Sequence, residues 1–189
     1  MTINLDKLFF DEKLKLAQSK NTPSEVLAEL SLENYHQILS LIASNPNTPL
    51  AVIEAMGEQY ADEIISNPVF ELLLLENPNS QFLKLCLASS SNTPIEILEK
   101  LSCDRDYTIR AKVAENNNIA NNLLKKLAED QSYHVIKSVL KNNNVSEDVL
   151  KTLTSNLIAN NYFSHKIIKH SKFSTDILYL LIKNINSNH

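Results

Sequence analysis

Glycine is almost absent from this chain, with one residue, Gly57, among 189. Motifs that cradle phosphates or present a nucleophile need glycine at several positions, because the backbone must turn sharply or approach a ligand closely. The sequence therefore excludes a Rossmann fingerprint, a Walker phosphate loop and a G-x-S-x-G nucleophile elbow. Tryptophan is also absent, and no acidic residue stands out as catalytic, so nothing supports a catalytic repeat protein such as a base-flipping DNA glycosylase.

Cysteine and long apolar runs are scarce as well. Cys86 and Cys103 are the only cysteines and are not at C-x-x-C spacing, so a zinc site, an iron–sulfur cluster or a dithiol lacks ligands. The longest apolar run, Ile177 to Ile182, is far shorter than the about 20 residues of a membrane span. Met1 to Lys15 lacks the apolar core of a signal peptide. We expect a cytoplasmic protein with no membrane association, no cofactor and no metal.

What the chain does contain is an internal repeat. The tripeptide Asn-Thr-Pro starts at Asn21, Asn47 and Asn92, and the frame of apolar residues that follows it returns after Asn118 and Asn144. A further unit must fill the long gap and starts near Val69. The predicted repeats cover residues 21–171 and start at residues 21, 47, 69, 92, 118 and 144. Residues 1–20 read as an N-terminal capping helix and residues 172–189 as a C-terminal cap, so one repeat domain spans residues 1–189.

Each unit has two apolar segments with helical spacing. The first half carries a pair such as Val26/Leu27, and the second half carries one residue four positions before a pair, as in Ile38 and Ile42/Ala43. Spacings of i, i+4 and i+5 place these side chains on one stripe of a short helix. A unit of two short helices cannot bury its stripes alone, so the copies must stack. The predicted fold is all-α, an α-solenoid of about six two-helix repeats.

The residues between the helices predict where each helix starts and stops. Threonine before proline is typical of a helix start, so Thr22, Thr48 and Thr93 are predicted N-caps. Asparagine tolerates the left-handed conformation that ends many helices. In a chain with almost no glycine, the asparagines that close the units are predicted to adopt it: Asn45, Asn67, Asn116 and Asn142.

The segment from Ala43 to Pro49, followed by Val52, Ile53 and Met56, and its echo from Ser91 to Pro94, resemble the leucine-rich repeat variant, a short bacterial repeat. The resemblance covers roughly residues 21–183. It implies a right-handed superhelix related to the HEAT and armadillo solenoids, in which the second helix of each unit is partly a 3₁₀ helix. One member of that family carries an iron–sulfur cluster on N-terminal cysteines. Residues 1–40 contain no cysteine, so that cofactor is not expected.

Charge divides unevenly along the chain. Residues 1–91 hold 5 Lys or Arg and 12 Asp or Glu, whereas residues 92–189 hold 13 and 10. Stacking places equivalent positions side by side, so Lys125 and Lys151 are predicted to form one basic ladder and Lys141 and Lys169 another. Tyr107 and Tyr133 also share a repeat position, 26 residues apart. No histidine has metal-ligand spacing: there is no H-E-x-x-H, and His165 and His170 are five residues apart.

These observations favour a non-enzymatic scaffold that binds a protein partner through a solenoid face. The candidate partner-binding residues are Tyr107, Arg110, Lys125, Tyr133, Lys137, Lys141 and Lys151. The alternative is a HEAT-like solenoid that binds nucleic acid through its basic C-terminal half, and this predicts a steep dependence on salt. An acidic half and a basic half would also allow head-to-tail self-association. The sequence identifies neither the partner nor the oligomeric state.

Overall fold

The structure is a computed structural model that describes residues 4–159, and every regular element within that range is a helix. The predicted all-α class is confirmed for this range. The second helix of the last repeat, with Lys169 and the two histidines His165 and His170, lies outside the described residues, as does the predicted C-terminal cap 172–189. None of the described helices has the length and apolar character needed to cross a membrane.

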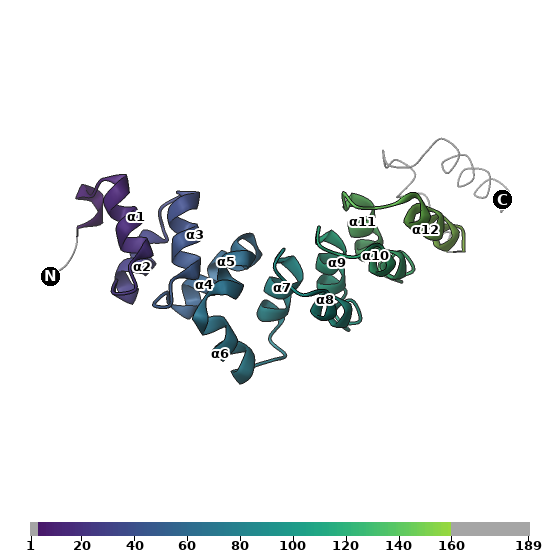
Figure 1. The fold of residues 1–189 in the computed structure, drawn as a ribbon, viewed down its shortest axis with the longest axis horizontal. Coiled ribbons are helices and arrows are strands. Elements are labelled where there is room, and N and C mark those ends of the chain that lie inside the picture. Colours follow the sequence, from purple (N-terminus) through teal and green to yellow (C-terminus); the bar gives the residue numbers. More distant parts are fainter. Residues whose placement is uncertain (1–3, 160–189) are drawn as a thin grey trace. The chain divides into compact units, whose positions relative to one another are not determined.

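Contacts between residues divide the chain into two compact units, Met1–Ser90 and Ser91–His189. The first unit contains the following helices: η1 Leu5–Lys7, α1 Phe10–Gln18, α2 Ser24–Leu30, α3 His36–Ser44, α4 Leu50–Met56, η2 Gly57–Tyr60, α5 Ala61–Ser66, α6 Pro68–Glu76 and α7 Gln81–Ser89 (Figure 1). The described part of the second unit contains α8 Ile95–Leu101, α9 Tyr107–Glu115, α10 Asn121–Leu127, α11 Tyr133–Lys141 and α12 Glu147–Ala159.

The second helices of neighbouring predicted repeats pack against one another, and α1 of the N-terminal cap packs against the first of them. In the first unit α1 contacts α3, α3 contacts α5 and α5 contacts α7, and in the second unit α9 contacts α11 (Figure 1). The stripe predicted for these helices forms the core, since Ile38, Ile42 and Ala43 are fully buried in α3. The equivalent residues of α9 and α11 are buried too: Ile109, Val113, Ala114, Val135, Val139 and Leu140. Burial of these apolar side chains is what stabilises helices too short to persist alone.

The prediction that the threonines cap the first helices is wrong. The N-caps of α2, α4 and α8 are Pro23, Pro49 and Pro94, each with an extended ψ near 145°, so each helix begins one residue after the proline. The hydroxyl of Thr48 donates instead to the carbonyl oxygen of Ile42 at 2.6 Å, in the last turn of the preceding helix. Thr22 bonds Leu16 in the same way. These threonines therefore fasten the chain to the helix just completed.

The prediction of left-handed asparagines is also wrong. Among the described residues the only positive φ belongs to Gly57, at 54°, after α4. Asn67 has φ −71° and ψ 127°, an extended conformation, and is buried. Its Nδ2 donates to the carbonyl oxygens of Ala43 and Asn45, both at 2.9 Å, and its Oδ1 accepts the N–H of Val69 at 3.0 Å. A glycine could not make these bonds.

The same asparagine clamp recurs along the chain. Asn45 donates to the carbonyl oxygens of Ala17 and Ser19 at 2.8 and 3.0 Å, and Asn142 donates to those of Ala114 and Asn116 at the same two distances. Asn67 and Asn142 thus link to the end of the equivalent helix in the preceding predicted repeat, and Asn45 links to the end of α1 in the N-terminal cap. Because buried carbonyl groups need a partner, the carboxamide satisfies backbone groups that would otherwise be unpaired.

The helices differ in two respects from the pattern expected of the repeats. The 3₁₀ character implied by the family resemblance is confined, in the described range, to η1 and η2, whereas α3, α7, α9 and α11 are α-helices. In the last described repeat, α12 has 13 residues where α2 has 7. The helix α12 therefore continues past the point at which the earlier first helices stop.

Candidate functional site

A surface groove lies between α9 and α11, the two neighbouring second helices of the second unit. Its lining residues are Tyr107, Thr108, Ala111, Lys112, Glu115, His134, Lys137, Ser138 and Lys141. Three of the seven candidates from the sequence, Tyr107, Lys137 and Lys141, line this groove. The small side chain of Ala111 on α9 leaves room between the two helices.

Aromatic rings form one end of the groove. The rings of Tyr107 and His134 are stacked, with centroids 5.2 Å apart and an angle of 25° between their planes. The ring of Tyr133 meets His134 edge to face at 5.8 Å. Tyr107 and His134 are exposed. The predicted pair of tyrosines is thus joined through a histidine that sequence reasoning did not single out for binding, and the three rings form an amphipathic surface of the kind that anchors a partner.

Positive charge dominates the rest of the groove. The charged residues that line the groove are three lysines, Lys112, Lys137 and Lys141, and one carboxylate, Glu115. That carboxylate accepts a hydrogen bond from Ser138 Oγ at 2.9 Å and lies 3.4 Å from Lys112 Nζ. The side chains of Lys137 and Lys141 are exposed, one turn apart on α11. Lysines around a groove attract carboxylates and phosphates, and the attraction is screened by salt where the charges are exposed.

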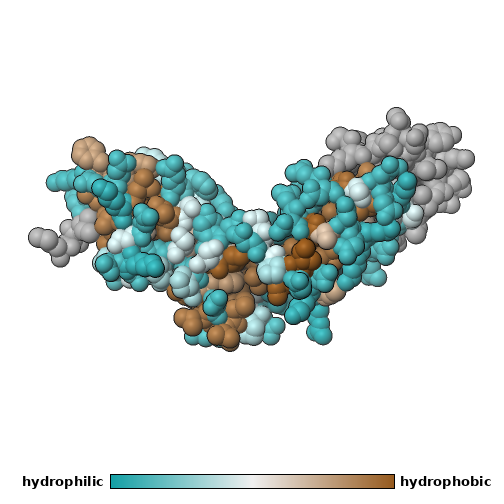
Figure 2. Space-filling model, viewed as in Figure 1, coloured by the Kyte–Doolittle hydropathy of each residue, from teal (hydrophilic) through white to brown (hydrophobic). Residues whose placement is uncertain are grey.

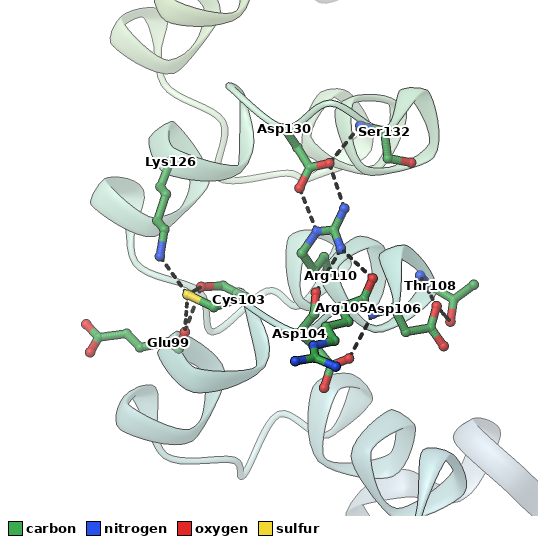
Figure 3. A network of polar contacts seen from close by, with 11 residues as sticks. Glu99, Cys103, Asp104, Arg105, Asp106, Thr108, Arg110, Lys126, Asp130 and Ser132 are labelled. Atoms are coloured by element: carbon green, nitrogen blue, oxygen red, sulfur yellow. Dashed lines mark hydrogen bonds and ion pairs between the residues drawn. The ribbon is translucent and has the colours of Figure 1, made fainter. Parts of the chain in front are cut away.

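Arg110, another candidate, does not reach the groove and is held in a network next to it (Figure 3). Its Nε and Nη2 donate to Asp130 Oδ2 and Oδ1 at 2.7 and 3.0 Å, and its Nη1 donates to the carbonyl oxygen of Asp104 at 2.8 Å. The hydrogen bond to Asp130 raises the pKa of Arg110 above its already high value. Arg110 therefore ties the loop before α9 to the loop before α11, and so fixes the starts of both groove helices.

The predicted basic ladder of Lys125 and Lys151 is accompanied by negative charge. Lys125 Nζ lies 2.7 Å from Asp148 Oδ2, and Lys151 Nζ lies 3.0 Å from Glu147 Oε1. The hydrogen bond from Lys125 holds the pKa of the Asp148 carboxyl below its usual value. These two lysines therefore share their surface with carboxylates.

Cys103 has a partner that the sequence does not reveal. Lys126 Nζ donates to its sulfur at 2.9 Å, and the thiol is exposed (Figure 3). This hydrogen bond, with a weaker one from Ser102, lowers the pKa of Cys103. Cys86 is the opposite case, since burial raises the pKa of its thiol to about 12. Within residues 4–159, no group of three or more His, Cys, Asp or Glu side chains is arranged to hold a metal ion.

Sequence reasoning found part of this site and missed part of it. The repeat spacing placed Tyr107 and Tyr133 at equivalent positions. In the structure Tyr107 lines the groove, and Tyr133 contacts the groove residue His134 without lining the groove itself. Sequence reasoning missed Lys112 and His134. The one signal for His134 was its position directly after Tyr133, which the repeat spacing had already singled out. Compared with protein-family models, curated proteins and solved structures, the chain matches none.

Proposed function

We propose that this chain is a non-enzymatic α-solenoid of the leucine-rich-repeat-variant type that binds a protein partner, and that the groove between α9 and α11 holds an acidic segment of that partner. The observation that carries the proposal is the groove itself, with three lysines, one internally bonded carboxylate and a stacked Tyr107–His134 pair. Its chemistry suits recognition through charge and aromatic contact.

The asparagine clamps support the solenoid part of the proposal. Asn67 bonds backbone of the repeat before it, and Asn142 does the same 75 residues later in the chain. A bond repeated in register between neighbours is what a stack of similar units requires. The right-handed superhelix and the family resemblance belong to the proposal, as does a cytoplasmic location, where the exposed thiol of Cys103 would remain reduced.

A protein segment is favoured over nucleic acid as the ligand because of how the basic residues are distributed. A nucleic-acid surface needs many cations that follow a phosphate backbone. Lys125 and Lys151 were predicted to form a basic ladder that would extend such a surface, but both pair with carboxylates. The lysines of the groove, Lys112, Lys137 and Lys141, form a short cluster that adjoins exposed aromatic rings. This arrangement fits a short acidic stretch with one aromatic or apolar residue.

The test is an affinity pull-down from native lysate with the tagged full chain, with and without nuclease and at two salt concentrations. Three proteins are compared: the wild type, the groove variant Lys137→Glu/Lys141→Glu, and the matched control Lys125→Glu/Lys151→Glu. Both double variants change the net charge equally and alter exposed positions. Circular dichroism of the three proteins serves as the control for folding, since each should retain its helical content.

The proposal expects a discrete protein that survives nuclease, is captured by the wild type and the control, and is lost with the groove variant. Recovery of nucleic acid, with every associated protein lost after nuclease, overturns it in favour of the nucleic-acid alternative. Equal loss with the control variant overturns the assignment to the groove, because it would show that only net charge matters.

A further inference from the structure

Helix α6 in the first unit exposes leucines where the other repeats bury them. The sixth residue after the start of a repeat is buried in all five other predicted repeats, namely Leu27, Ile53, Leu98, Leu124 and Leu150. In the repeat that starts at Val69 the same position is Leu75, which is 81% exposed. Leu72, three residues earlier on the same stripe, is 60% exposed.

The local chain explains why α6 differs. A single residue, Asn67, separates α5 from α6, whereas Asn45 to Pro49 separate α3 from α4. Without the longer Thr-Pro connection α6 begins at Pro68, four residues earlier in the repeat than its counterparts. When a helix begins at a different position of the repeat, different side chains lie on the face that packs against the core. The sequence of α6 is apolar on all sides, so leucines remain at the surface whichever face is buried.

A hollow that Leu73 of the same helix lines is suited to a side chain. It lies between α4, α6 and α7, is open to solvent and has a volume of about 170 Å³. Its apolar lining consists of Leu50, Leu73, Phe82 and Leu83, with Glu54 and Glu76 among the polar residues around it. An apolar cavity of about 150 Å³ accommodates a benzene ring, so this hollow has room for one large aliphatic or aromatic side chain. The space-filling view shows hydrophobic surface gathered over α6, at the lower edge (Figure 2).

The charge on the three helices that form this surface is mostly negative. Residues 21–83 contain nine Asp or Glu and no Lys or Arg. Lys84 on α7 is the one basic residue of α4, α6 and α7, and it is partly buried. Glu54, Glu71 and Glu76, on the helices that form the surface, are exposed. A contiguous apolar patch with a charged rim is characteristic of an interaction site, and carboxylates at the rim select a partner of opposite charge.

We propose that the surface formed by Leu50, Leu72, Leu75 and the hollow, here called the α6 surface, is a second docking site that binds a cationic amphipathic helix of a protein partner. One apolar side chain of that helix fills the hollow, its neighbours cover Leu72 and Leu75, and its Lys or Arg residues face Glu54, Glu71 and Glu76. The site lies in a different unit from the α9/α11 groove and does not depend on it.

The charges argue against two other occupants. A second copy docked α6 against α6 would bring Glu71 and Glu76 of both copies together, and like charges at an interface are unfavourable. A membrane with anionic lipids would be repelled by the same carboxylates, since such membranes attract basic segments. The cationic helix satisfies both the apolar surface and the acidic rim.

The test is fluorescence anisotropy of the full chain with a labelled synthetic helix of leucine and lysine at amphipathic spacing. Two matched probes accompany it, one with every lysine replaced by glutamate and one with the central leucine replaced by serine. The apolar variant is Leu72→Ser/Leu75→Ser, and its control is Leu32→Ser, which alters a leucine 84% exposed on the same unit. The charge variant is Glu54→Gln/Glu76→Gln, and its control is Glu25→Gln/Glu29→Gln on α2.

Saturable binding of the leucine–lysine helix is expected, with Kd raised about tenfold or more by either α6-surface variant and left unchanged by either control. Neither matched probe should bind with comparable affinity. The proposal is overturned if the controls weaken binding as much as the α6-surface variants, because attraction would then depend on overall charge or apolarity. It is equally overturned if light scattering shows a dimer that Leu72→Ser/Leu75→Ser dissolves, because the occupant would then be a second copy.

Discussion

Arg110 and Asp130 form a two-point ion pair between consecutive repeats, with Nε to Oδ2 at 2.7 Å and Nη2 to Oδ1 at 3.0 Å. Both side chains are largely buried, at 18% and 9% exposure. The same carboxylate accepts the N–H of Ser132 at 2.7 Å at the start of α11. One pair therefore sets the spacing of α9 and α11, and with it the width of the groove between them.

Arg110→Lys should destabilise the second unit although it conserves charge. Lysine cannot reproduce the two parallel bonds to Asp130 together with the bond to the Asp104 carbonyl. We expect a loss of about 1–3 kcal/mol in the free energy of unfolding, measured by urea denaturation. Lys125→Met, which breaks an exposed pair, is the control and should change stability much less. If Arg110→Lys unfolds at the same urea concentration as the wild type, the Arg110–Asp130 pair does not contribute to stability.

Asn67→Gly distinguishes the clamp from a left-handed turn. If asparagine were present for a left-handed conformation, glycine would be tolerated or even preferred. Because the clamp supplies two donors to buried carbonyls, we expect glycine to cost about 2–4 kcal/mol. Thermal and urea unfolding provide the measurement, and Asn79→Gly, in the exposed loop after α6, is the matched control. Equal stability of the two variants would contradict the clamp.

Cys103 should be the reactive thiol of the chain. The hydrogen bond from Lys126 lowers the pKa of Cys103, whereas burial raises that of Cys86 to about 12. At neutral pH more of Cys103 is thiolate, the form that attacks alkylating reagents. Limiting iodoacetamide followed by mass spectrometry should label Cys103 first.

Removing the lysine should slow that labelling. In Lys126→Met the pKa of Cys103 returns towards its ordinary value, so the pH at which labelling is half-maximal rises and the rate at neutral pH falls several-fold. Lys125→Met, one residue away, should label at the wild-type rate. Labelling of Cys86 before Cys103 in the native protein would contradict the structure.

Asp148 should titrate below its ordinary value of 3.8, because Lys125 favours its charged form. A group whose pKa is depressed by folding adds stability above its unfolded value, and that stability is lost as the pH falls through the folded value. Carboxyl NMR titration should give a midpoint that rises towards 3.8 in Lys125→Met. Added salt should shift the wild-type midpoint in the same direction, since the pair is exposed.

The sequence predicted the helices and their buried faces because apolar residues at helical spacing all lie on the face that packs against the core. Ile38, Ile42 and Ala43 were identified from spacing alone and are fully buried. The same spacing singled out Tyr107, which lines the groove, and Tyr133, whose ring contacts His134 in the groove. Equivalent apolar positions are buried in α3, α9 and α11 because each of these helices packs against another helix of similar sequence pattern.

The sequence did not predict what the polar residues between helices do. Thr48 and Asn67 have strong local preferences as caps, and those preferences led to the wrong assignments. Their actual partners, Ile42 in the helix before and Ala43 in the repeat before, are set by packing. The pair of Arg110 with Asp130 and that of Lys126 with Cys103 join residues 20 and 23 positions apart for the same reason.

The clamps give the chain a direction. Asn45 and Asn67 reach back to carbonyl groups that precede them by 22 to 28 residues, and Asn142 does the same in the second unit. During synthesis the acceptors of each clamp therefore leave the ribosome before its donor does. Each clamp can therefore form as its asparagine emerges, because the carbonyl groups that it binds have already been synthesised.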